Sequence, residues 1–213
     1  NKAIKKCKSI IEEFNPDIIL VTHGHSDHLG DAMELSNKNN VPVAAIHEIS
    51  LFLSKQGINN IGVNIGGSFI YRGVKFTMLD AKHSSVLDIV EEPLPAGDAA
   101  SFLITLEDGT KLFHAGDTGL FGDMKTIIGE IYKPDIALLP IGDKFTMGPF
   151  EAALATRWID PKVALPMHYN TFPPIEQDPS IYANFVSQLN PNIDVVILNP
   201  GEYFEYNPEN YQD

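Results

Sequence analysis

Four potential metal ligands lie within six residues of the segment Val21-Thr22-His23-Gly24-His25-Ser26-Asp27-His28. An apolar run precedes this segment and a helical pattern follows it, which places the ligands where a strand turns into a helix. His23 and His25 are two residues apart, so in an extended chain both side chains project to the same side. Asp27 and His28 lie where the chain enters the helix. One short loop can therefore present ligands to two adjacent metal ions.

Chance is a weak explanation for this grouping, because histidine makes up only 7 of the 213 residues. The frequencies of His and Asp in the chain give roughly 0.0005 expected occurrences of the pattern. Imidazole and carboxylate ligands together favour zinc, with manganese, iron and nickel as alternatives, whereas calcium and magnesium prefer oxygen ligands alone. The sequence therefore predicts two divalent metal ions, with zinc as the first choice.

Outside this segment, apolar stretches alternate with segments of helical periodicity. The predicted helices span 3–15, 30–39, 47–55, 122–132, 149–159 and 180–189. The predicted strands span 17–22, 42–46, 69–71, 74–79, 101–106, 111–114, 135–140, 163–166, 194–198 and 202–206. Residues 84–99 show no clear period and are predicted to form a loop long enough to cover a site. The alternation predicts a single α/β domain over residues 1–213.

Three further candidate ligands follow predicted strands. His83 comes after 74–79, Asp117 after 111–114 and His168 after 163–166. In an α/β sheet the carboxyl ends of the strands form the functional edge, so residues distant in sequence can converge there. Each residue alone would more often be structural, and it is their common placement that makes them candidates.

Composition and charge limit the class of protein. With 44% hydrophobic residues the chain can bury a substantial core, and no apolar run approaches the roughly 18 residues of a membrane-spanning helix. A formal net charge of −13 opposes the approach of a polyanion, so we expect a small-molecule substrate and no nucleic-acid or membrane partner. Cys7 has no second cysteine to pair with and no leader precedes the first predicted helix, which together favour the cytoplasm.

The spacing of the candidate ligands resembles the metallo-β-lactamase superfamily, whose signature is His-x-His-x-Asp-His followed by a His, an Asp and a final His. Shorter motifs resemble, within that superfamily, the uncharacterised metal-dependent hydrolases related to L-ascorbate-6-phosphate lactonase. These motifs read HAGDT at 114–118, LPIGD at 139–143, FTMGP at 145–149 and PMHYNT at 166–171. The resemblance extends from about residue 17 to the end of the chain.

The resemblance implies a ligand set and a fold. One ion would be held by His23, His25 and His83, and the other by Asp27, His28 and His168, with Asp117 bridging them. The implied fold is an αββα four-layer sandwich, in which two mixed sheets lie back to back and the metals sit at one edge. Family members begin with a β-hairpin region that includes a Gly-His-Ser motif, which has no match here. Either the sequence lacks its amino-terminal strands, or the protein builds its first sheet without them.

The expected chemistry is metal-assisted hydrolysis, in which water between two ions roughly 3.5–4 Å apart attacks a carbonyl or phosphoryl centre. Asp27 can orient that water or receive its proton, or it can serve only as a ligand. The candidate substrate contacts are Lys144, Tyr169 and Asn170. The alternative for Lys144 is a solvated side chain, and the alternative for Tyr169 and Asn170 is packing or turn formation. Phe172 either walls the pocket or stiffens the loop after His168.

Two histidines stay outside the predicted ligand set. His114 is expected either to orient a ligand near Asp117 or to lie satisfied in the core. His47 is expected to be structural, at the start of a helix.

Three functional classes fit these observations. The preferred one is a hydrolase of a small ester, lactone, amide or phosphoester. A nuclease or phosphodiesterase of the same superfamily would need a basic track, and the lysines within 2–8 are expected to form a solvated helix face instead. A non-catalytic metal-binding protein is the third, but seven ligands shared by two ions leave positions open for water, as catalytic sites do. A homo-oligomer is compatible with all three.

Overall fold

The computed structural model describes residues 15–211, and its larger sheet has seven strands in the order β12-β11-β10-β9-β8-β5-β4. These are β4 (Ser68–Tyr71), β5 (Val74–Asp80), β8 (Ala100–Thr105), β9 (Lys111–His114), β10 (Ile136–Pro140), β11 (Val163–Met167) and β12 (Asp194–Val195). Strands β9 to β12 run parallel, whereas β4, β5, β8 and β9 pair antiparallel. The carboxyl ends of β5, β9, β10 and β11 consequently meet at one edge of a mixed sheet.

The smaller sheet contains β1 (Ile19–Leu20), β2 (Val43–Ile46) and β3 (Asn60–Val63), in that order. All its pairs are parallel. Every residue of β2 is buried, as expected for a central parallel strand covered on both faces. The resemblance implied two mixed sheets, and this part of the expectation is wrong for the described residues, because only the larger sheet is mixed.

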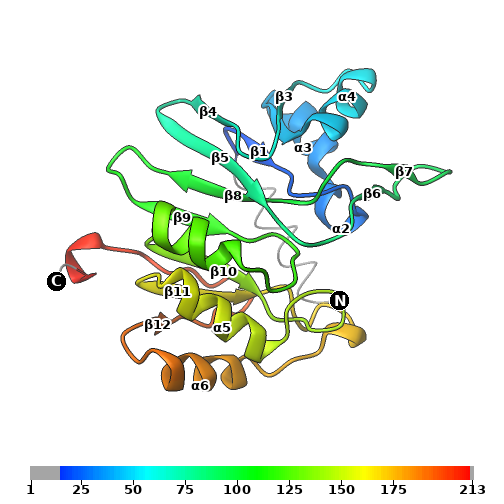
Figure 1. Cartoon of the computed structure of the whole chain (residues 1–213). Helices are drawn as coiled ribbons and strands as arrows, with labels where there is room; N and C mark the ends of the chain where they lie inside the picture. The colour runs from blue at the N-terminus through cyan, green and yellow to red at the C-terminus, as the bar shows by residue number, and fades with distance from the viewer. Residues whose placement is uncertain (1–14, 212–213) are drawn as a thin grey trace.

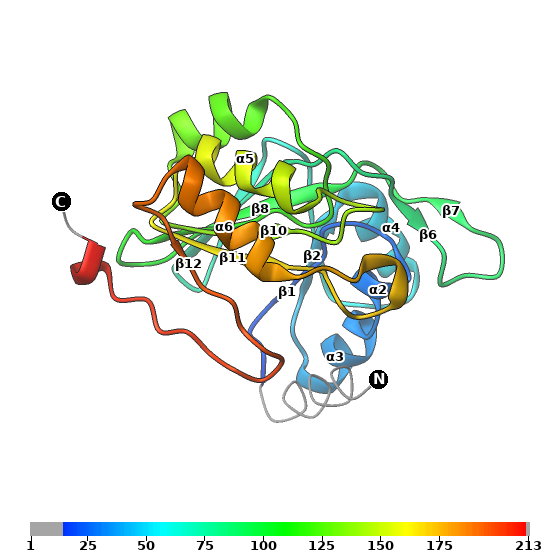
Figure 2. The ribbon, with the colours of Figure 1, turned by 90° about the horizontal axis from the view of Figure 1, so that it is seen from below.

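Helices cover the outer faces of the two sheets (Figures 1 and 2). The π-helix η1 (Met124–Tyr132), α5 (Pro149–Ile159) and α6 (Pro179–Leu189) lie on the larger sheet. Short helix α2 (Ser26–Leu29), α3 (Ala32–Asn39) and α4 (His47–Lys55) accompany the smaller sheet. The layers are therefore helix, sheet, sheet, helix, and the predicted αββα sandwich is confirmed. Within 15–211 no helix is long and apolar enough to cross a bilayer.

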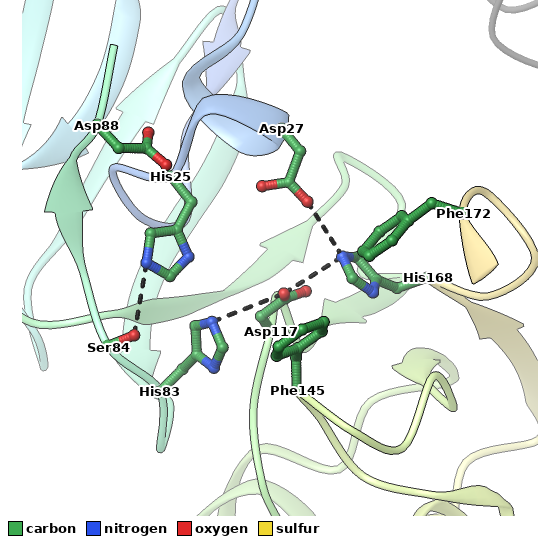
Figure 3. A pocket seen from close by; sticks show the side chains of 9 residues that line it. All are labelled: His25, Asp27, His83, Ser84, Asp88, Asp117, Phe145, His168 and Phe172. Atoms are coloured by element: carbon green, nitrogen blue, oxygen red, sulfur yellow. Dashed lines mark hydrogen bonds and ion pairs between the residues drawn. The ribbon is translucent and has the colours of Figure 1, made fainter. Parts of the chain in front are cut away.

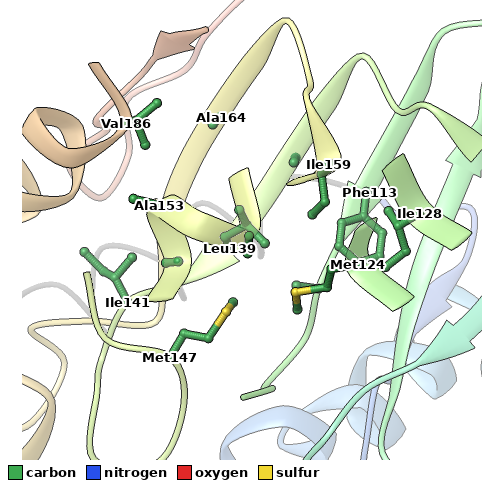
Figure 4. Close-up of a cluster of buried hydrophobic side chains, with 14 of the residues drawn as sticks. Phe113, Met124, Ile128, Leu139, Ile141, Met147, Ala153, Ile159, Ala164 and Val186 are labelled. Carbon is green, nitrogen blue, oxygen red and sulfur yellow. The ribbon is translucent and has the colours of Figure 1, made fainter. Parts of the chain in front are cut away.

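Two apolar clusters hold the layers together. The first lies between the larger sheet and its helices, where Phe113 and Leu139 pack against Met124, Ile128 and Ile159 (Figure 4). The second joins the two sheets, since Val43 and Ile46 of β2 share a cluster with Met78 of β5 and Phe102 of β8. Because both sheets are buried against each other, their edges are held in fixed relation, and the loops at those edges can form a precise site.

Most predicted elements are confirmed within one or two residues, and the exceptions have physical reasons. Strand β3 was not predicted because Asn60 and Gly62 have low β propensity, and its pairing with β2 stabilises it instead. The predicted loop 84–99 contains a short hairpin of β6 (Val86–Leu87) and β7 (Leu94–Pro95). Residues 202–206 alternate like a strand but pair with no described strand, so that prediction is wrong. The helix predicted over 3–15 falls outside the described residues, apart from residue 15.

Gly129 lies where η1 packs against α5. A β-carbon at this position would overlap the carbonyl oxygen of Trp158 and approach Ile159 Cα to 3.1 Å. We expect Gly129→Ala to lower the free energy of unfolding by about 2–3 kcal/mol, because the two helices must separate. Urea denaturation measures this change. Gly122→Ala is the matched control, since an added β-carbon there meets no atom within 4 Å, and equal unfolding midpoints for the two variants would contradict the prediction.

Candidate metal centre

Four loops bring the predicted ligands together at the edge where the two sheets meet (Figure 3). The loop after β1 carries His23, His25, Asp27 and His28 into α2. The segments that follow β5, β9 and β11 supply His83, Asp117 and His168, respectively. Seven side chains that the sequence placed at separate strand ends thus gather in one cluster, as the shared placement predicted.

The first ligand group consists of His23, His25 and His83, whose ligand atoms all lie within 4.8 Å of one another. Nε2 of His23 is 3.0 Å from Nδ1 of His25. The Thr22 hydroxyl hydrogen-bonds Nδ1 of His23 at 3.0 Å, and the Ser84 hydroxyl is 3.4 Å from Nε2 of His25. Each hydroxyl engages the ring nitrogen that points away from the cluster, and so orients the other nitrogen inward.

The second group consists of Asp27, His28 and His168, again with ligand atoms within 4.8 Å of one another. Asp27 Oδ2 lies 3.5 Å from Nε2 of both His28 and His168. Asp117 Oδ2 is 3.3 Å from the same two nitrogens and 3.8 Å from Nε2 of His83. A third combination, His23, His28 and Asp117, also has its ligand atoms within 4.8 Å of one another. Asp117 therefore approaches members of both groups, and its role as a shared ligand stays a prediction.

Three buried polar atoms in the described part of the chain have no hydrogen-bond partner, and all belong to this cluster. They are His28 Nε2, Asp117 Oδ1 and His168 Nδ1. His28 Nε2 is close to Asp117 Oδ2 but outside hydrogen-bond geometry. Because an unsatisfied buried polar atom costs roughly 1–3 kcal/mol, His28 Nε2 and Asp117 Oδ1 point to a ligand that would satisfy them. His168 faces the cluster with Nε2, so a ligand bound there would leave its Nδ1 unpartnered.

The charges in the cluster depend on one another. Burial lowers the pKa of His23 to about 3 and also lowers that of His83. Burial would lower the pKa of His28 too, but its contacts with Asp117 and Asp27 outweigh burial and raise this pKa to about 9. His168 and His28 hold the pKa of Asp27 well below its usual range. At neutral pH the metal-free cluster thus combines a neutral His23, a cationic His28 and an ionised Asp27.

His114 does not join the ligand groups. Its Nδ1 accepts a hydrogen bond from the backbone N–H of Gly116 at 3.2 Å, which shapes the turn leading to Asp117. Burial lowers the pKa of His114 to about 4, so the ring is neutral and can accept that bond. Of the two roles considered for this residue, the structure supports positioning of the ligand loop.

Gly24 allows the β6–β7 hairpin to dock against the ligand loop. A β-carbon at Gly24 would lie 2.7 Å from Ala96 Cβ and 2.8 Å from the carbonyl oxygen of Val86. The N–H of Gly24 donates to the Ser85 hydroxyl at 3.2 Å. The hairpin lies beside α2 for this reason (Figure 1). The sequence had predicted this segment only as a loop that covers a site.

We expect Gly24→Ala to weaken metal binding by about tenfold or more, because the displaced hairpin no longer holds Ser84 against His25. Competition with a chromophoric chelator measures the affinity. Gly119→Ala is the matched control, because its added β-carbon makes only an ordinary 3.8 Å contact. Unchanged metal affinity in Gly24→Ala would show that the hairpin does not support the ligands.

A cavity of about 430 Å³ opens onto the cluster. It is lined by His25, Asp27, His83, Ser84, Asp88, Asp117, Phe145, His168 and Phe172 (Figure 3). Of the candidate substrate contacts, Tyr169 packs against the apolar core, and the side-chain Oδ1 of Asn170 accepts a hydrogen bond from the backbone N–H of Gln177. Lys144 holds its ammonium 5.5 Å from the centre of the Phe145 ring. None of the three lines this cavity, so their role as substrate contacts stays a prediction.

Comparison with known proteins identifies the family. Residues 3–169 match the beta-lactamase superfamily domain. A UPF0173 metal-dependent hydrolase of Methanobrevibacter smithii is 97% identical over 97% of this chain and 87% of its own length. The chain belongs to the UPF0173 metal-dependent hydrolases. A relative of the same name from Methanosphaera stadtmanae is 53% identical over 92% of this chain and 84% of its own.

A solved structure supports the metallo-hydrolase fold of this UPF0173 hydrolase. It is Igni18, a metallo hydrolase from the hyperthermophilic archaeon Ignicoccus hospitalis, and it is 38% identical with a TM-score of 0.83. The match covers 94% of this chain and 84% of that one. Sequence reasoning on this UPF0173 hydrolase missed Ser84, Asp88 and Phe145 as cavity residues. The available signals in the sequence were positional: Ser84 follows His83, Asp88 lies in the 84–99 loop, and Phe145 begins the FTMGP motif.

Proposed function

We propose that this chain is a binuclear metal-dependent hydrolase that cleaves a small ester, lactone, amide or phosphoester. The observation that carries the proposal is the pair of three-residue ligand groups with Asp117 between them, beside an open cavity. Structural metal sites are usually closed by four protein ligands, whereas this arrangement shares seven ligands between two ions. A small-molecule substrate fits both the cavity and the net charge of −13, which opposes a polyanion.

The residues present fit such ions, because His28 Nε2 and Asp117 Oδ1 are buried without a hydrogen-bond partner and the imidazole and carboxylate donors are those that a divalent cation would coordinate. His23, His25 and His83 would hold one ion, Asp27, His28 and His168 the other, and Asp117 both. Bound ions would supply an activated water and polarise the scissile carbonyl or phosphoryl group. The mixed donor set favours zinc, with manganese, iron or nickel as alternatives.

Asp27 is the residue we propose to act on the proton of the attacking water. Both Asp27 and Asp117 line the cavity, but the Asp27 side chain is 55% exposed whereas Asp117 is buried. The lowered pKa of Asp27 keeps it ionised at neutral pH, so the carboxylate can accept a hydrogen bond from the attacking water and orient it. A single cysteine in 213 residues supports the cytoplasm as the site of this activity.

Metal analysis combined with hydrolysis assays tests the proposal. The purified protein should contain about two divalent ions per chain and should hydrolyse members of a panel of aryl esters, lactones and phosphodiesters. Chelation should remove the activity, and adding back zinc or manganese should restore it. A fully loaded protein that cleaves nothing on the panel would contradict the hydrolase proposal and favour the non-catalytic alternative.

We expect metal binding near pH 7.5 to release at least one proton per chain, because coordination needs a neutral imidazole and the pKa of His28 is about 9 beforehand. Metal affinity should rise with pH up to about 9 and then level off. Calorimetry in buffers with different ionisation enthalpies counts the protons. An observed enthalpy that is the same in every buffer would contradict this prediction.

A further inference from the structure

Two cavity walls consist of side chains that belong to neither ligand group. Phe145 and Phe172 form one wall, next to Asp117 and His168, and Ser84 and Asp88 lie on the other side beside His25 (Figure 3). A substrate that occupies this cavity would contact these walls. Their chemistry therefore limits what the site can accept, and the inference drawn from it rests on the proposed function.

The aromatic wall comes from two separate loops. Phe145 lies between β10 and α5, and Phe172 follows β11, yet the ring centroids are 6.2 Å apart at an interplanar angle of 29°. Phe145 is 47% exposed and Phe172 is 39% exposed. Two stacked rings that remain this exposed at a cavity leave apolar surface that a flat or bulky apolar group could cover.

The opposite wall is acidic. Asp88 extends from the β6–β7 hairpin, where its Oδ2 accepts a hydrogen bond from the Ser26 hydroxyl at 3.3 Å. No lysine or arginine of residues 15–211 is among the residues that line the cavity. Lys82, close in sequence to Ser84, forms an ion pair with Asp80 instead. The Lys144 ammonium lies 5.5 Å from the centre of the Phe145 ring, on the aromatic side of the cavity. An additional anionic group placed beside Asp88, away from Lys144 and the ligand cluster, would therefore be repelled by the Asp88 carboxylate.

We infer that the site selects uncharged carbonyl substrates, namely carboxylic esters, lactones or amides, which seat an aromatic or bulky apolar group against Phe145 and Phe172. Asp88 disfavours substrates that carry a further negative charge. The inference narrows the proposed substrate class to uncharged carbonyl compounds and excludes phosphorylated compounds.

Binding of hydroxamates to the metal-loaded protein tests the aromatic wall without requiring turnover. Acetohydroxamate and benzohydroxamate share the metal-binding group, and the phenyl ring should tighten binding by about tenfold in the parent protein. Phe172→Ala and Phe145→Ala should each remove most of that advantage while leaving acetohydroxamate binding unchanged. Phe150→Ala is the matched control, because Phe150 is 46% exposed and lies outside the cavity lining.

A second pair of probes tests the acidic wall. Succinohydroxamate and its terminal amide have the same shape and differ in one negative charge. Asp88→Asn should tighten binding of the acid by about fivefold and leave binding of the amide unchanged. Titration calorimetry at low ionic strength gives the dissociation constants of the acid and the amide for both the parent protein and Asp88→Asn.

The outcomes separate this inference from the hydrolase proposal. An equal phenyl advantage in parent and Phe variants, or an equal effect of Asp88→Asn on acid and amide, would overturn the inference even if the protein hydrolyses esters. The expected hydroxamate pattern in a protein that cleaves no substrate would support the site's selectivity and contradict the hydrolase proposal. If phosphomonoesters are cleaved faster than matched aryl carboxylic esters, the proposed substrate class is wrong.

Discussion

Asp117→Ala is expected to reduce the metal content from about two ions to fewer than one per chain and to lower hydrolysis by at least about 100-fold. Asp117 Oδ2 is the atom that contacts both ligand groups, since it lies within 3.8 Å of His28, His83 and His168. Loss of residues that merely support ligands already costs about 10–100-fold in metal affinity, so loss of a shared ligand should cost more.

Elemental analysis after gel filtration, together with initial rates, measures this effect. Asp108→Asn is the matched control, because Asp108 is an exposed aspartate whose turn-forming hydrogen bond to the N–H of Thr110 an asparagine can replace. Circular dichroism should show that both variants remain folded. Two ions per chain in a folded Asp117→Ala variant would exclude Asp117 as a shared ligand.

His168→Ala should lose one ion and keep the other. His168 belongs to the group with Asp27 and His28, whereas His23, His25 and His83 form the other group without it. The metal content is expected to fall from about two ions to about one, and activity to fall by at least about 100-fold because both ions act on the same reaction centre. His83→Ala should lose the other ion, and the double variant should lose both.

Anomalous scattering on crystals of the two variants would show which position is emptied in each. His47→Gln serves as the control, since His47 begins α4 and belongs to neither ligand group. Emptying of the same position in His83→Ala and His168→Ala would contradict the division into two groups. Stability needs separate measurement, because the left-handed backbone of His168, with φ of 55°, can relax when its side chain is removed.

Local signals in the sequence predicted a large part of the fold. The strands predicted over 101–106 and 111–114 correspond to β8 and β9, and helical spacing over 47–55 predicted the bounds of α4. Predictions were wrong where pairing partners decide the structure. Asn60–Val63 forms a strand because β2 lies beside it, while residues 202–206 have an alternating pattern but no described partner. Strand formation depends on neighbours that local periodicity does not encode.

The sequence by itself indicated the ligand chemistry, because the four candidate ligands of the first loop lie within six residues and their types and order do not depend on the folding of the remaining chain. It also indicated His83, Asp117 and His168, since the ends of parallel strands share one edge. The family resemblance implied a division of these side chains into two groups, and only the tertiary structure gave the distances within the groups and showed that Asp88 faces the cavity from one side and two phenylalanines from the other. Distances between separate loops are set by the packing of two sheets against each other, a long-range property that spacing along the chain does not contain.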